Sequence, residues 1–266
     1  MDAKKETSDV ALAWDEAARD YDAYFSPRFA PYLGAALGAL VGRRSDLPRT
    51  GCIVVPCTGP GRELGPLARA FPERKIVASD LSGEMVNLAR ERNLRFQNVS
   101  VEQDDATRLR PPASEVAALY SVFGLQLLPS PAQTLASWLG LLRPKGLAVV
   151  VYWPRNRDEG GPFDVMQRLC AESTTVDRAW ENELEASARA ASCHVREDAR
   201  IAFPMQHEDA RDMWQALTRL GPLRGLALAR GQAFVDRLGA RFEAEFPAGP
   251  LSHEPEARLL LVERDG

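Results

Sequence analysis

Residues 51–65 read GCIVVPCTGPGRELG, and this stretch decides how the chain is expected to fold. An apolar run from Ile53 to Val55 ends in a turn that contains Gly59 and Gly61, and residues that can start a helix follow at once. Because glycine has no Cβ, glycines between a strand and a helix let the backbone approach a ligand or a neighbouring element closely. The stretch therefore predicts a strand, a tight turn and a helix, with a ligand or a packed element against the turn.

The composition is that of an ordinary globular protein, with 266 residues and 45% hydrophobic content. This length suffices for one large core, or for one core with a smaller subdomain. The net charge of −4 and the pI near 5.6 give no broad positive field, so we expect no nucleic acid partner. No apolar run approaches the roughly 18 to 20 residues of a membrane span. We expect a cytoplasmic monomer or homodimer without membrane attachment.

The four cysteines Cys52, Cys57, Cys170 and Cys193 form no CxxC pair. They are too few and too scattered for a disulfide framework, so we interpret them as reduced thiols. Cys193 and His194 are adjacent and would rarely bind one metal ion together. We therefore expect no metal site.

Between residues 51 and 153, short β-like runs alternate with helical periods, which is the pattern of a parallel sheet covered on both faces. Residues 8–42, rich in aromatics, indicate one or two amphipathic helices. Residues 155–197 are polar and mostly helical, and helices are expected across 207–245. The expected strands are 52–56, 75–79, 99–103, 116–121, 147–153, 198–203 and 257–263. The pattern predicts a doubly wound α/β fold.

In a doubly wound sheet the ligand lies outside the carboxyl ends of the strands. Asp80 ends the second expected strand, about 19 residues beyond Gly61, near the spacing at which an acid meets ribose hydroxyls. Its acceptor oxygens suit two adjacent hydroxyl donors. Asp105 and Ala106 follow the third strand, where an acid can accept a hydrogen bond from an adenine amino group.

Three interpretations of the glycine turn compete. A dinucleotide fingerprint, GxGxxG, would need a third glycine where Leu64 stands, and Gly65 comes one residue late. A Walker A loop would need Gly-Lys followed by Ser or Thr, which the sequence lacks. The third interpretation is a turn that binds a nucleoside without a pyrophosphate, which requires the backbone to approach the ligand closely.

Residues 51–153 resemble a class I S-adenosylmethionine-dependent methyltransferase of the small-molecule, type 11/25-like kind. Five stretches match in order: IVVPCTGPG, VASDLSGEM, DDATRL, ALYSVFGLQLLPSP and LLRPKGLAVVVYWP. Five ordered matches are more specific than any one glycine motif. The resemblance implies a mostly parallel, seven-stranded, Rossmann-like sheet with an antiparallel last strand and a helical cover. It also implies S-adenosylmethionine as the cofactor, with S-adenosylhomocysteine as the product.

Two positions depart from the family pattern. Val55 stands where an acid usually ends the first strand, and Cys57 stands where the first glycine is expected. The acid normally helps to organise the turn and the amino end of the cofactor, so another residue must compensate, and Tyr21 or Tyr24 is a candidate. We interpret Cys57 as a small space-filler beside the cofactor rather than a reactive thiolate.

The resemblance, together with the aromatics near the expected ligand edge, gives two sets of predicted contacts. The predicted cofactor contacts are Tyr21, Cys57, Gly59, Gly61, Asp80, Leu81, Met85, Asp105, Ala106, Ser121 and Gln126. The predicted substrate contacts are Tyr24, Phe25, Gln126, Tyr152, Trp153 and Trp214. Aromatic rings can exclude water and hold an apolar or cationic acceptor. The alternative is that half or more of these rings only pack the cover onto the sheet.

The expected reaction is methyl transfer to a small-molecule acceptor whose reacting atom, O, N, S or C, stays open. Such an in-line displacement depends mainly on alignment and desolvation. A hydroxyl or amine acceptor also needs a proton removed, and Tyr21 and His207 are the candidate catalytic residues, although capping a helix start is the commoner role for a histidine placed like His207. Two alternatives remain: a non-methylating displacement such as cyclisation of S-adenosylmethionine, and a cofactor-binding regulatory protein without turnover.

We expect these parts to form one domain over residues 1–266. Its parts are a helical lid at 1–45, a cofactor-binding core at 51–153, a substrate cover with inserted helices at 154–250, and a last strand at 251–266.

Overall fold

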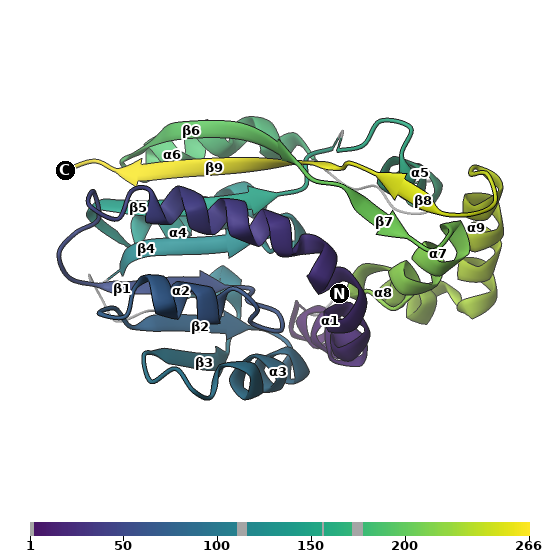
Figure 1. Cartoon of the computed structure of the whole chain (residues 1–266), viewed down its shortest axis with the longest axis horizontal. Helices are drawn as coiled ribbons and strands as arrows, with labels where there is room; N and C mark the ends of the chain where they lie inside the picture. The colour runs from purple at the N-terminus through teal and green to yellow at the C-terminus, as the bar shows by residue number, and fades with distance from the viewer. Residues whose placement is uncertain (1–2, 111–115, 156, 172–177) are drawn as a thin grey trace. The chain divides into compact units, whose positions relative to one another are not determined.

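The computed structural model describes residues 3–110, 116–155, 157–171 and 178–266 (Figure 1). The chain divides into two compact units, which are described separately. Unit 1 comprises residues 1–29, 155–177 and 202–256, and unit 2 comprises residues 30–154, 178–201 and 257–266. Residues 156 and 172–177, within the predicted helical segment 155–197, lie outside the described residues.

Unit 2 is built on a seven-stranded sheet with the order β3-β2-β1-β4-β5-β9-β6. Its strands are β1 (Cys52–Pro56), β2 (Ile76–Asp80), β3 (Val99–Gln103), β4 (Val116–Val122), β5 (Leu142–Tyr152), β6 (Cys193–Ala202) and β9 (Glu256–Arg264). Strands β1 to β5 pair in parallel, and β9 runs antiparallel to β5. The predicted doubly wound, mostly parallel sheet with an antiparallel last strand is confirmed.

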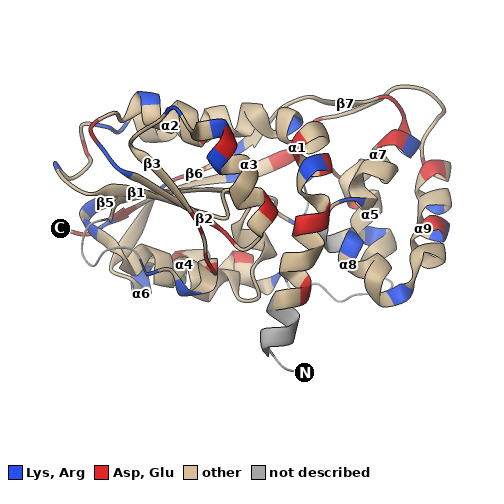
Figure 2. Cartoon of the chain, turned by 90° about the horizontal axis from the view of Figure 1, so that it is seen from below, with Lys and Arg blue, Asp and Glu red and all other residues tan. Residues whose placement is uncertain are grey.

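Helices cover both faces of this sheet. They are α2 (Leu64–Ala70), α3 (Gly83–Asn93), α4 (Pro131–Gly140), α6 (Leu184–Ala190) and the C-terminal part of α1 (Ala3–Val41). Figures 1 and 2 show α2 on one face and α4 and α6 on the other. Because both faces are covered, the central strands β1 and β4 are apolar and buried along nearly their whole length.

Local sequence explains where the helices of unit 2 begin. The Ser82 hydroxyl accepts a hydrogen bond from the Met85 amide and caps α3. Pro131 occupies the first turn of α4, where its missing N–H costs nothing. Trp138 of α4 is buried in the core, and its indole nitrogen donates to the carbonyl of Ala106, which fixes the turn after β3.

Unit 1 holds the N-terminal part of α1 together with α5 (Pro162–Ala171), α7 (Ala210–Thr218), α8 (Gly221–Arg230) and α9 (Gln232–Ala244). A two-stranded antiparallel ribbon, β7 (Met205–His207) with β8 (Leu251–His253), completes it. The sequence predicted one or two helices over 8–42, and the structure has one.

Three local predictions are wrong. Residues 193–197 belong to β6 rather than to a helical segment, residue 207 ends β7 rather than starting a helix, and residues 251–253 form a separate short strand, β8, rather than the start of the last strand. Strand β6 lies at an edge of the sheet and is largely exposed, so it carries charged residues that hide the strand pattern. Three-residue strands such as β7 and β8 are too short to show any periodicity.

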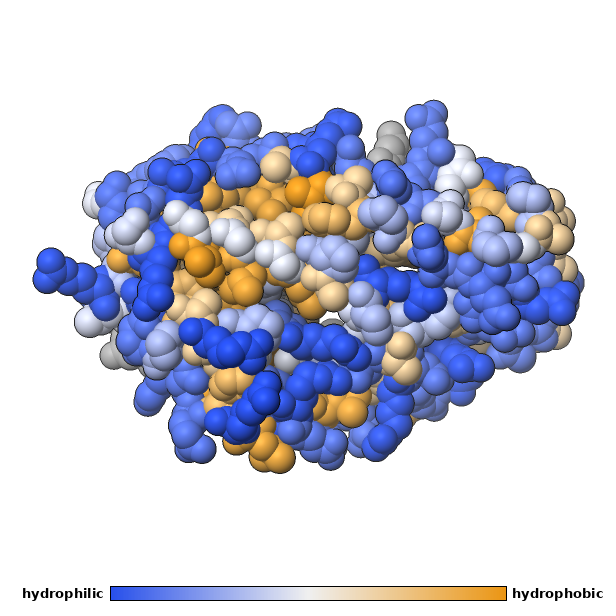
Figure 3. Space-filling view, viewed as in Figure 1, coloured by the Kyte–Doolittle hydropathy of each residue, from blue (hydrophilic) through white to orange (hydrophobic). Residues whose placement is uncertain are grey.

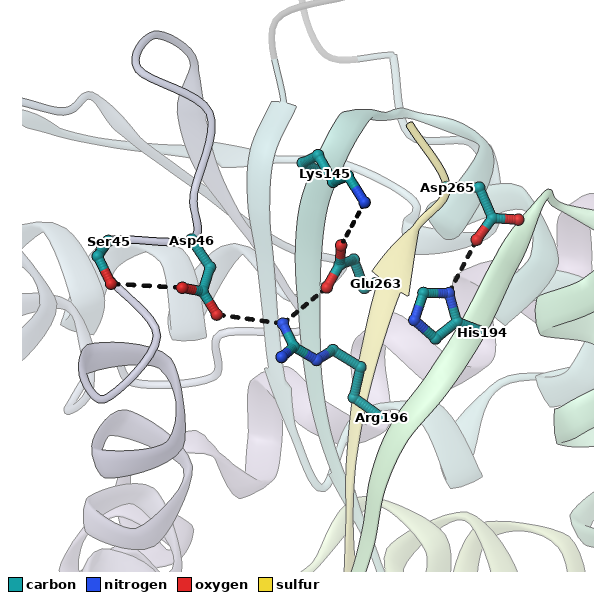
Figure 4. Close-up of polar contacts among 7 residues, drawn as sticks. All are labelled: Ser45, Asp46, Lys145, His194, Arg196, Glu263 and Asp265. Atoms are coloured by element: carbon teal, nitrogen blue, oxygen red, sulfur yellow. Dashed lines mark hydrogen bonds and ion pairs between the residues drawn. The ribbon is translucent and has the colours of Figure 1, made fainter.

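Ion pairs join the last strands of unit 2 to the loop after α1 (Figure 4). Arg196 of β6 donates to Glu263 of β9 at 2.7 Å and to Asp46 at 3.1 Å, and Lys145 lies 3.2 Å from Glu263. Most of these side chains are partly exposed, so each pair contributes only about 0–1 kcal/mol. The network ties β6 and β9 to the loop after α1.

The surface carries both signs of charge. Figure 2 shows Lys and Arg interspersed with Asp and Glu along the helices, and Figure 3 shows apolar patches interrupted by polar side chains. None of the described helices combines the length and the apolar character that crossing a bilayer requires.

Candidate active site

The turns after β1 and β4 adopt backbone conformations that most residues avoid. Gly59 and Gly61 have φ values of 54° and 67°, and Cys57, which has a side chain, has φ of 54°. Phe123, directly after β4, has φ of 61°. A residue with a side chain adopts this region at a cost of about 1–3 kcal/mol, and such residues cluster where ligands bind. Two of them at neighbouring strand ends therefore indicate a functional site.

These two turns touch each other. A Cβ added to Gly124 would lie 2.5 Å from the Cβ of Cys57 and 3.3 Å from the hydroxyl oxygen of Ser121. The missing side chain at Gly124 is what lets the Cys57 side chain fit there. Burial raises the pKa of the Cys57 thiol, and the charges of Asp80 and Asp105 raise it further. Cys57 is therefore a neutral thiol between the two turns.

Gly61 has a packing reason to lack a side chain. A Cβ there would lie 2.7 Å from the Cβ of Ala89 on α3 and 3.0 Å from a methyl group of Leu64. The side-chain amide of Asn93 also donates to the Gly61 carbonyl at 2.9 Å. Gly61 thus allows the start of α2 to lie against α3, in addition to its positive φ.

Asp80 lies at the glycine turn. Its carboxylate accepts from the Gly59 amide at 2.8 Å and from the Ser82 amide at 3.1 Å. These two hydrogen bonds fix the carboxylate at the carboxyl end of β2, beside the end of β1. Leu81 follows it and is partly exposed, whereas Met85 is buried in α3.

Asp105 and Ala106 form a fixed turn after β3. One carboxylate oxygen of Asp105 accepts from the amide and from the hydroxyl of Thr107, at 2.9 and 2.7 Å. The Asp105 carboxylate therefore caps the short 3-10 helix Ala106–Arg108 and is held half-exposed at the sheet edge.

Two buried polar atoms near the end of β4 have no hydrogen-bond partner among the described residues. They are the hydroxyl oxygen of Ser121 and the amide oxygen of Gln126, whose nitrogen donates to the Phe123 carbonyl at 2.6 Å. A buried polar atom without a partner costs about 1–3 kcal/mol. Both atoms therefore fit a site whose remaining partner is a polar ligand, which is what S-adenosylmethionine would supply.

The sequence reasoning missed one buried ionisable group at this turn, Glu63. Its carboxylate accepts from the Thr58 hydroxyl at 2.5 Å, and the side chain is almost fully buried. Among the described residues, no Lys, Arg or His forms an ion pair with it. The signal in the sequence is an acid directly after Gly-Pro-Gly-Arg, at the point where a helix begins.

The predicted aromatic contacts of unit 2 lie in its core. Tyr152 is buried, with its ring centroid 5.2 Å from that of Trp180. The Trp153 ring stacks on that of Phe123, with the ring centroids 4.1 Å apart. The Tyr32 ring packs against Trp153 in a T-shaped arrangement, with the centroids 5.1 Å apart. Trp153 therefore supports the strained turn after β4, and substrate contact by these rings stays a prediction.

Unit 1 holds the remaining predicted residues. Phe25 is fully buried, and its ring lies 4.9 Å from that of Tyr24 and 6.4 Å from that of Tyr21, which is half-buried. Trp214 is buried against Phe242 at 5.1 Å. The aromatic alternative, in which such rings mainly pack helices, accounts for Phe25 and Trp214.

Five side chains of unit 1, those of Tyr24, Asp158, His207, Asp212 and His253, form a continuous hydrogen-bond network. His253 Nδ1 lies 3.0 Å from Asp158, and its Nε2 lies 3.1 Å from His207 Nε2. His207 Nδ1 lies 2.8 Å from the Tyr24 hydroxyl, which donates to Asp212 at 2.5 Å. His207 is thus buried within this hydrogen-bond network rather than capping a helix.

Asp209 performs the capping that the sequence suggested for His207. Its carboxylate accepts from the Asp212 amide at 2.7 Å at the start of α7. The expectation of a capping role at His207 is therefore wrong, because β7 extends to residue 207 and the helix begins only after Asp209.

The hydrogen bonds of this network constrain which of its groups donate and which accept. Burial, followed by the neighbouring His253, lowers the pKa of His207 to about 3, so its ring is neutral and donates through one nitrogen only. When Tyr24 donates to ionised Asp212, His207 must donate to Tyr24 and accept from His253. The other ring nitrogen of His253 lies against Asp158, which also accepts from the amides of residues 163 and 164.

No group of three or more His, Cys, Asp or Glu side chains in the described part of the chain is arranged to hold a metal ion.

Comparison with known proteins agrees with this geometry. Residues 53–146 match the family described as a methyltransferase domain. Two curated trans-aconitate 2-methyltransferases are similar to the chain: one from Variovorax paradoxus is 30% identical over 44% of this chain and 43% of its own length, and one from Azoarcus is 34% identical over 38% of each. The chain thus covers less than half of the length of these relatives.

The fold has relatives among solved structures. The YcgJ protein from Bacillus subtilis superposes with a TM-score of 0.60 at 15% identity, covering 88% of this chain and 99% of that one. At this identity the likeness concerns the fold alone. Residues 53–146 thus match the methyltransferase-domain family, and the confirmed strand order agrees with the fold of this solved relative.

Proposed function

We propose that this protein transfers the methyl group of S-adenosylmethionine to a small-molecule acceptor. The observation that carries the proposal is the grouping of the glycine turn, Asp80 and the unpartnered oxygens of Ser121 and Gln126 at the carboxyl ends of β1, β2 and β4. This is the edge at which an open α/β sheet binds its ligand. The cofactor supplies an electrophilic methyl group on a sulfonium.

The residues at this edge have separate tasks in the proposal. Asp80, already oriented by two amides, binds the ribose diol, and Asp105 lies where it meets the adenine. Ser121 and Gln126 donate to or accept from the amino-acid end. Leu81, Met85 and Ala106 provide the apolar surroundings, and Cys57 with Gly59 and Gly61 shapes the turn.

A small acceptor is supported by the curated relatives, whose names state that they act on trans-aconitate. For an acceptor that carries an O–H or N–H group, Tyr21 and His207 stay the candidate catalytic residues. Both ring nitrogens of His207 are engaged within unit 1 and burial lowers its pKa, so His207 is a weak base. Tyr21, whose ring is half-buried on α1, is therefore the preferred of the two candidates.

The test is turnover with labelled S-adenosylmethionine and a panel of small acceptors, beginning with trans-aconitate and continuing through phenols and amines. Formation of a methylated acceptor together with equimolar S-adenosylhomocysteine is expected. A methylthioadenosine product without an acceptor would instead indicate a non-methylating displacement. Tight binding of S-adenosylhomocysteine without turnover on any acceptor would indicate a regulatory protein.

A further inference from the structure

Glu63 is a carboxylic acid enclosed at the glycine turn without a positive partner. Only 8% of the residue is exposed, and its carboxylate accepts from the Thr58 hydroxyl at 2.5 Å and from its own backbone amide. No ion pair joins it to a cation in the described part of unit 2. A buried carboxylate is costly unless it is paired, so such a group is either held neutral or completed by a ligand.

The groups that face Glu63 come from four elements. Burial is the main cause that raises the pKa of its carboxyl to about 7, and Asp80 at the end of β2 adds to it. The hydrogen bonds from Thr58 and from its own backbone amide oppose this rise, as does Arg92 of α3. Tyr120 of β4 is also close enough for Glu63 to raise the pKa of its hydroxyl. Glu63 is therefore poised between its neutral and charged forms near neutral pH.

The surroundings explain what could complete it. At Val55, where the sequence pattern has an acid, the structure has a fully buried aliphatic side chain. Asp80 is the other carboxylate at this turn, and it already accepts from the amides of Gly59 and Ser82. This leaves Glu63 as the acid without an ion-paired cation, beside the turn that would hold the cofactor.

We propose that Glu63 pairs with the ammonium group of the amino-acid end of S-adenosylmethionine and so takes the place of the acid missing at Val55. The inference rests on the proposed function, because it requires this cofactor. The neutral carboxyl loses its proton to solvent as the ammonium arrives, and the resulting carboxylate pairs with the ammonium. Glu63 is a positioning residue in this proposal, since it contacts the end of the cofactor remote from the methyl group.

The competing explanation is that Glu63 only closes the turn through Thr58. The two explanations predict different changes in ligand affinity when Glu63 is altered. If Glu63 pairs with the ammonium, its loss lowers the affinity only of ligands that carry the amino-acid end. If Glu63 only closes the turn, its loss lowers the affinity of every ligand that contacts the turn.

The first measurement compares two ligands by calorimetry, S-adenosylhomocysteine and methylthioadenosine, which lacks the amino-acid end. Glu63→Gln keeps the shape and the acceptor for Thr58 but cannot become charged. We expect S-adenosylhomocysteine to bind about tenfold more weakly or worse, and methylthioadenosine to change by less than about twofold. Glu91→Gln, the same change at an exposed position of α3, should alter neither ligand.

The second measurement counts protons by repeating the titration in buffers of different ionisation enthalpy. With a carboxyl that titrates near pH 7, binding of S-adenosylhomocysteine should release about half a proton at pH 7 and close to one at pH 6. The ammonium of the ligand can also change its protonation on binding, so the release assigned to Glu63 is the difference between the wild type and Glu63→Gln. Methylthioadenosine should release no proton.

Equal weakening of both ligands in Glu63→Gln, or a proton release that the variant retains, would overturn this proposal and leave the proposed function intact. Failure of the wild-type protein to bind S-adenosylhomocysteine at all would overturn both. The two failures are thus distinguished by the wild-type titration alone.

Discussion

Unit 1 and unit 2 both bury ionisable side chains, and the units differ in how these side chains are partnered. In unit 1, all four ring nitrogens of His207 and His253 have hydrogen-bond partners within the unit. In unit 2, Glu63 accepts from the Thr58 hydroxyl and from its own amide but forms no ion pair, and the Ser121 hydroxyl has no partner among the described residues. Because an unpaired buried group is costly, a complete cluster stabilises its own unit and an incomplete one is suited to a ligand.

This comparison predicts that similar mutations in the two units change the stability of the ligand-free protein in opposite directions. Removing a member of a complete cluster leaves its partners buried and unpaired, which destabilises the protein. Neutralising a group in an incomplete cluster relieves a cost in the free protein and removes an interaction from the complex. The predictions below test this contrast, beginning with the largest effect.

Asp158→Ala should lower the free energy of unfolding by about 3–5 kcal/mol, because it removes the buried carboxylate that His253 contacts and leaves that ring nitrogen without a partner. It also removes the acceptor of two amides, at Phe163 and at residue 164, in the first turn of α5. Urea unfolding of the full chain measures the loss. The matched control is Asp265→Ala, which removes the partner of the exposed His194 and should change stability by less than about 0.5 kcal/mol (Figure 4). Equal losses in the two variants would contradict the comparison.

Glu63→Gln should make the ligand-free protein more stable than the wild type at alkaline pH. The folded-state pKa of about 7 lies above the ordinary value of 4.5, so the folded state binds the proton more tightly. The stability this provides is complete below pH 4.5 and is lost as the pH rises towards and through 7. The difference corresponds to about 3 kcal/mol at pH 8. Urea unfolding of both proteins at pH 4.5 and pH 8 measures it, and a wild type whose stability does not fall between these values would show that Glu63 is not held neutral.

The core strands could be predicted from the sequence because parallel strands buried on both faces are continuous apolar runs bounded by turn residues. Asp80 was found for a similar reason, since its position follows from the end of one such strand. The start of β6 and the β7–β8 ribbon were missed because exposed or very short strands carry no such pattern.

The polar clusters could not be predicted, for a different physical reason. Tyr24, Asp158, His207, Asp212 and His253 lie far apart in the sequence, and only the packing of α1, α7 and the ribbon brings them together. Glu63 was missed because an acid at a helix start is normally an exposed residue. Its burial depends on β4 and α3, which are distant in sequence.

Asp80→Asn tests a residue that is partnered in the free protein and is also proposed to bind the ligand. The amide oxygen of Asn can still accept from the Gly59 amide, so the loss of stability should be small, about 1 kcal/mol. Affinity for S-adenosylhomocysteine should fall about tenfold, because the ribose diol loses its charged acceptor. Methylthioadenosine carries the same ribose and should weaken equally, which separates this residue from Glu63. Calorimetry that shows unchanged binding would remove Asp80 from the site.

The smallest effect is expected at Ser121, where the unsatisfied atom is a neutral hydroxyl. In the ligand-free protein Ser121→Ala removes a buried oxygen that has no partner, so stability should stay level or rise by up to about 1 kcal/mol. In the complex one neutral hydrogen bond is lost, which should weaken S-adenosylhomocysteine by about 3- to 10-fold. Ser26 is a matched control, because its hydroxyl oxygen in unit 1 is also buried without a partner among the described residues. Ser26→Ala should stabilise to a similar degree and leave cofactor affinity unchanged, so thermal unfolding and calorimetry on the two variants separate an oxygen kept for a ligand from one that is only poorly packed.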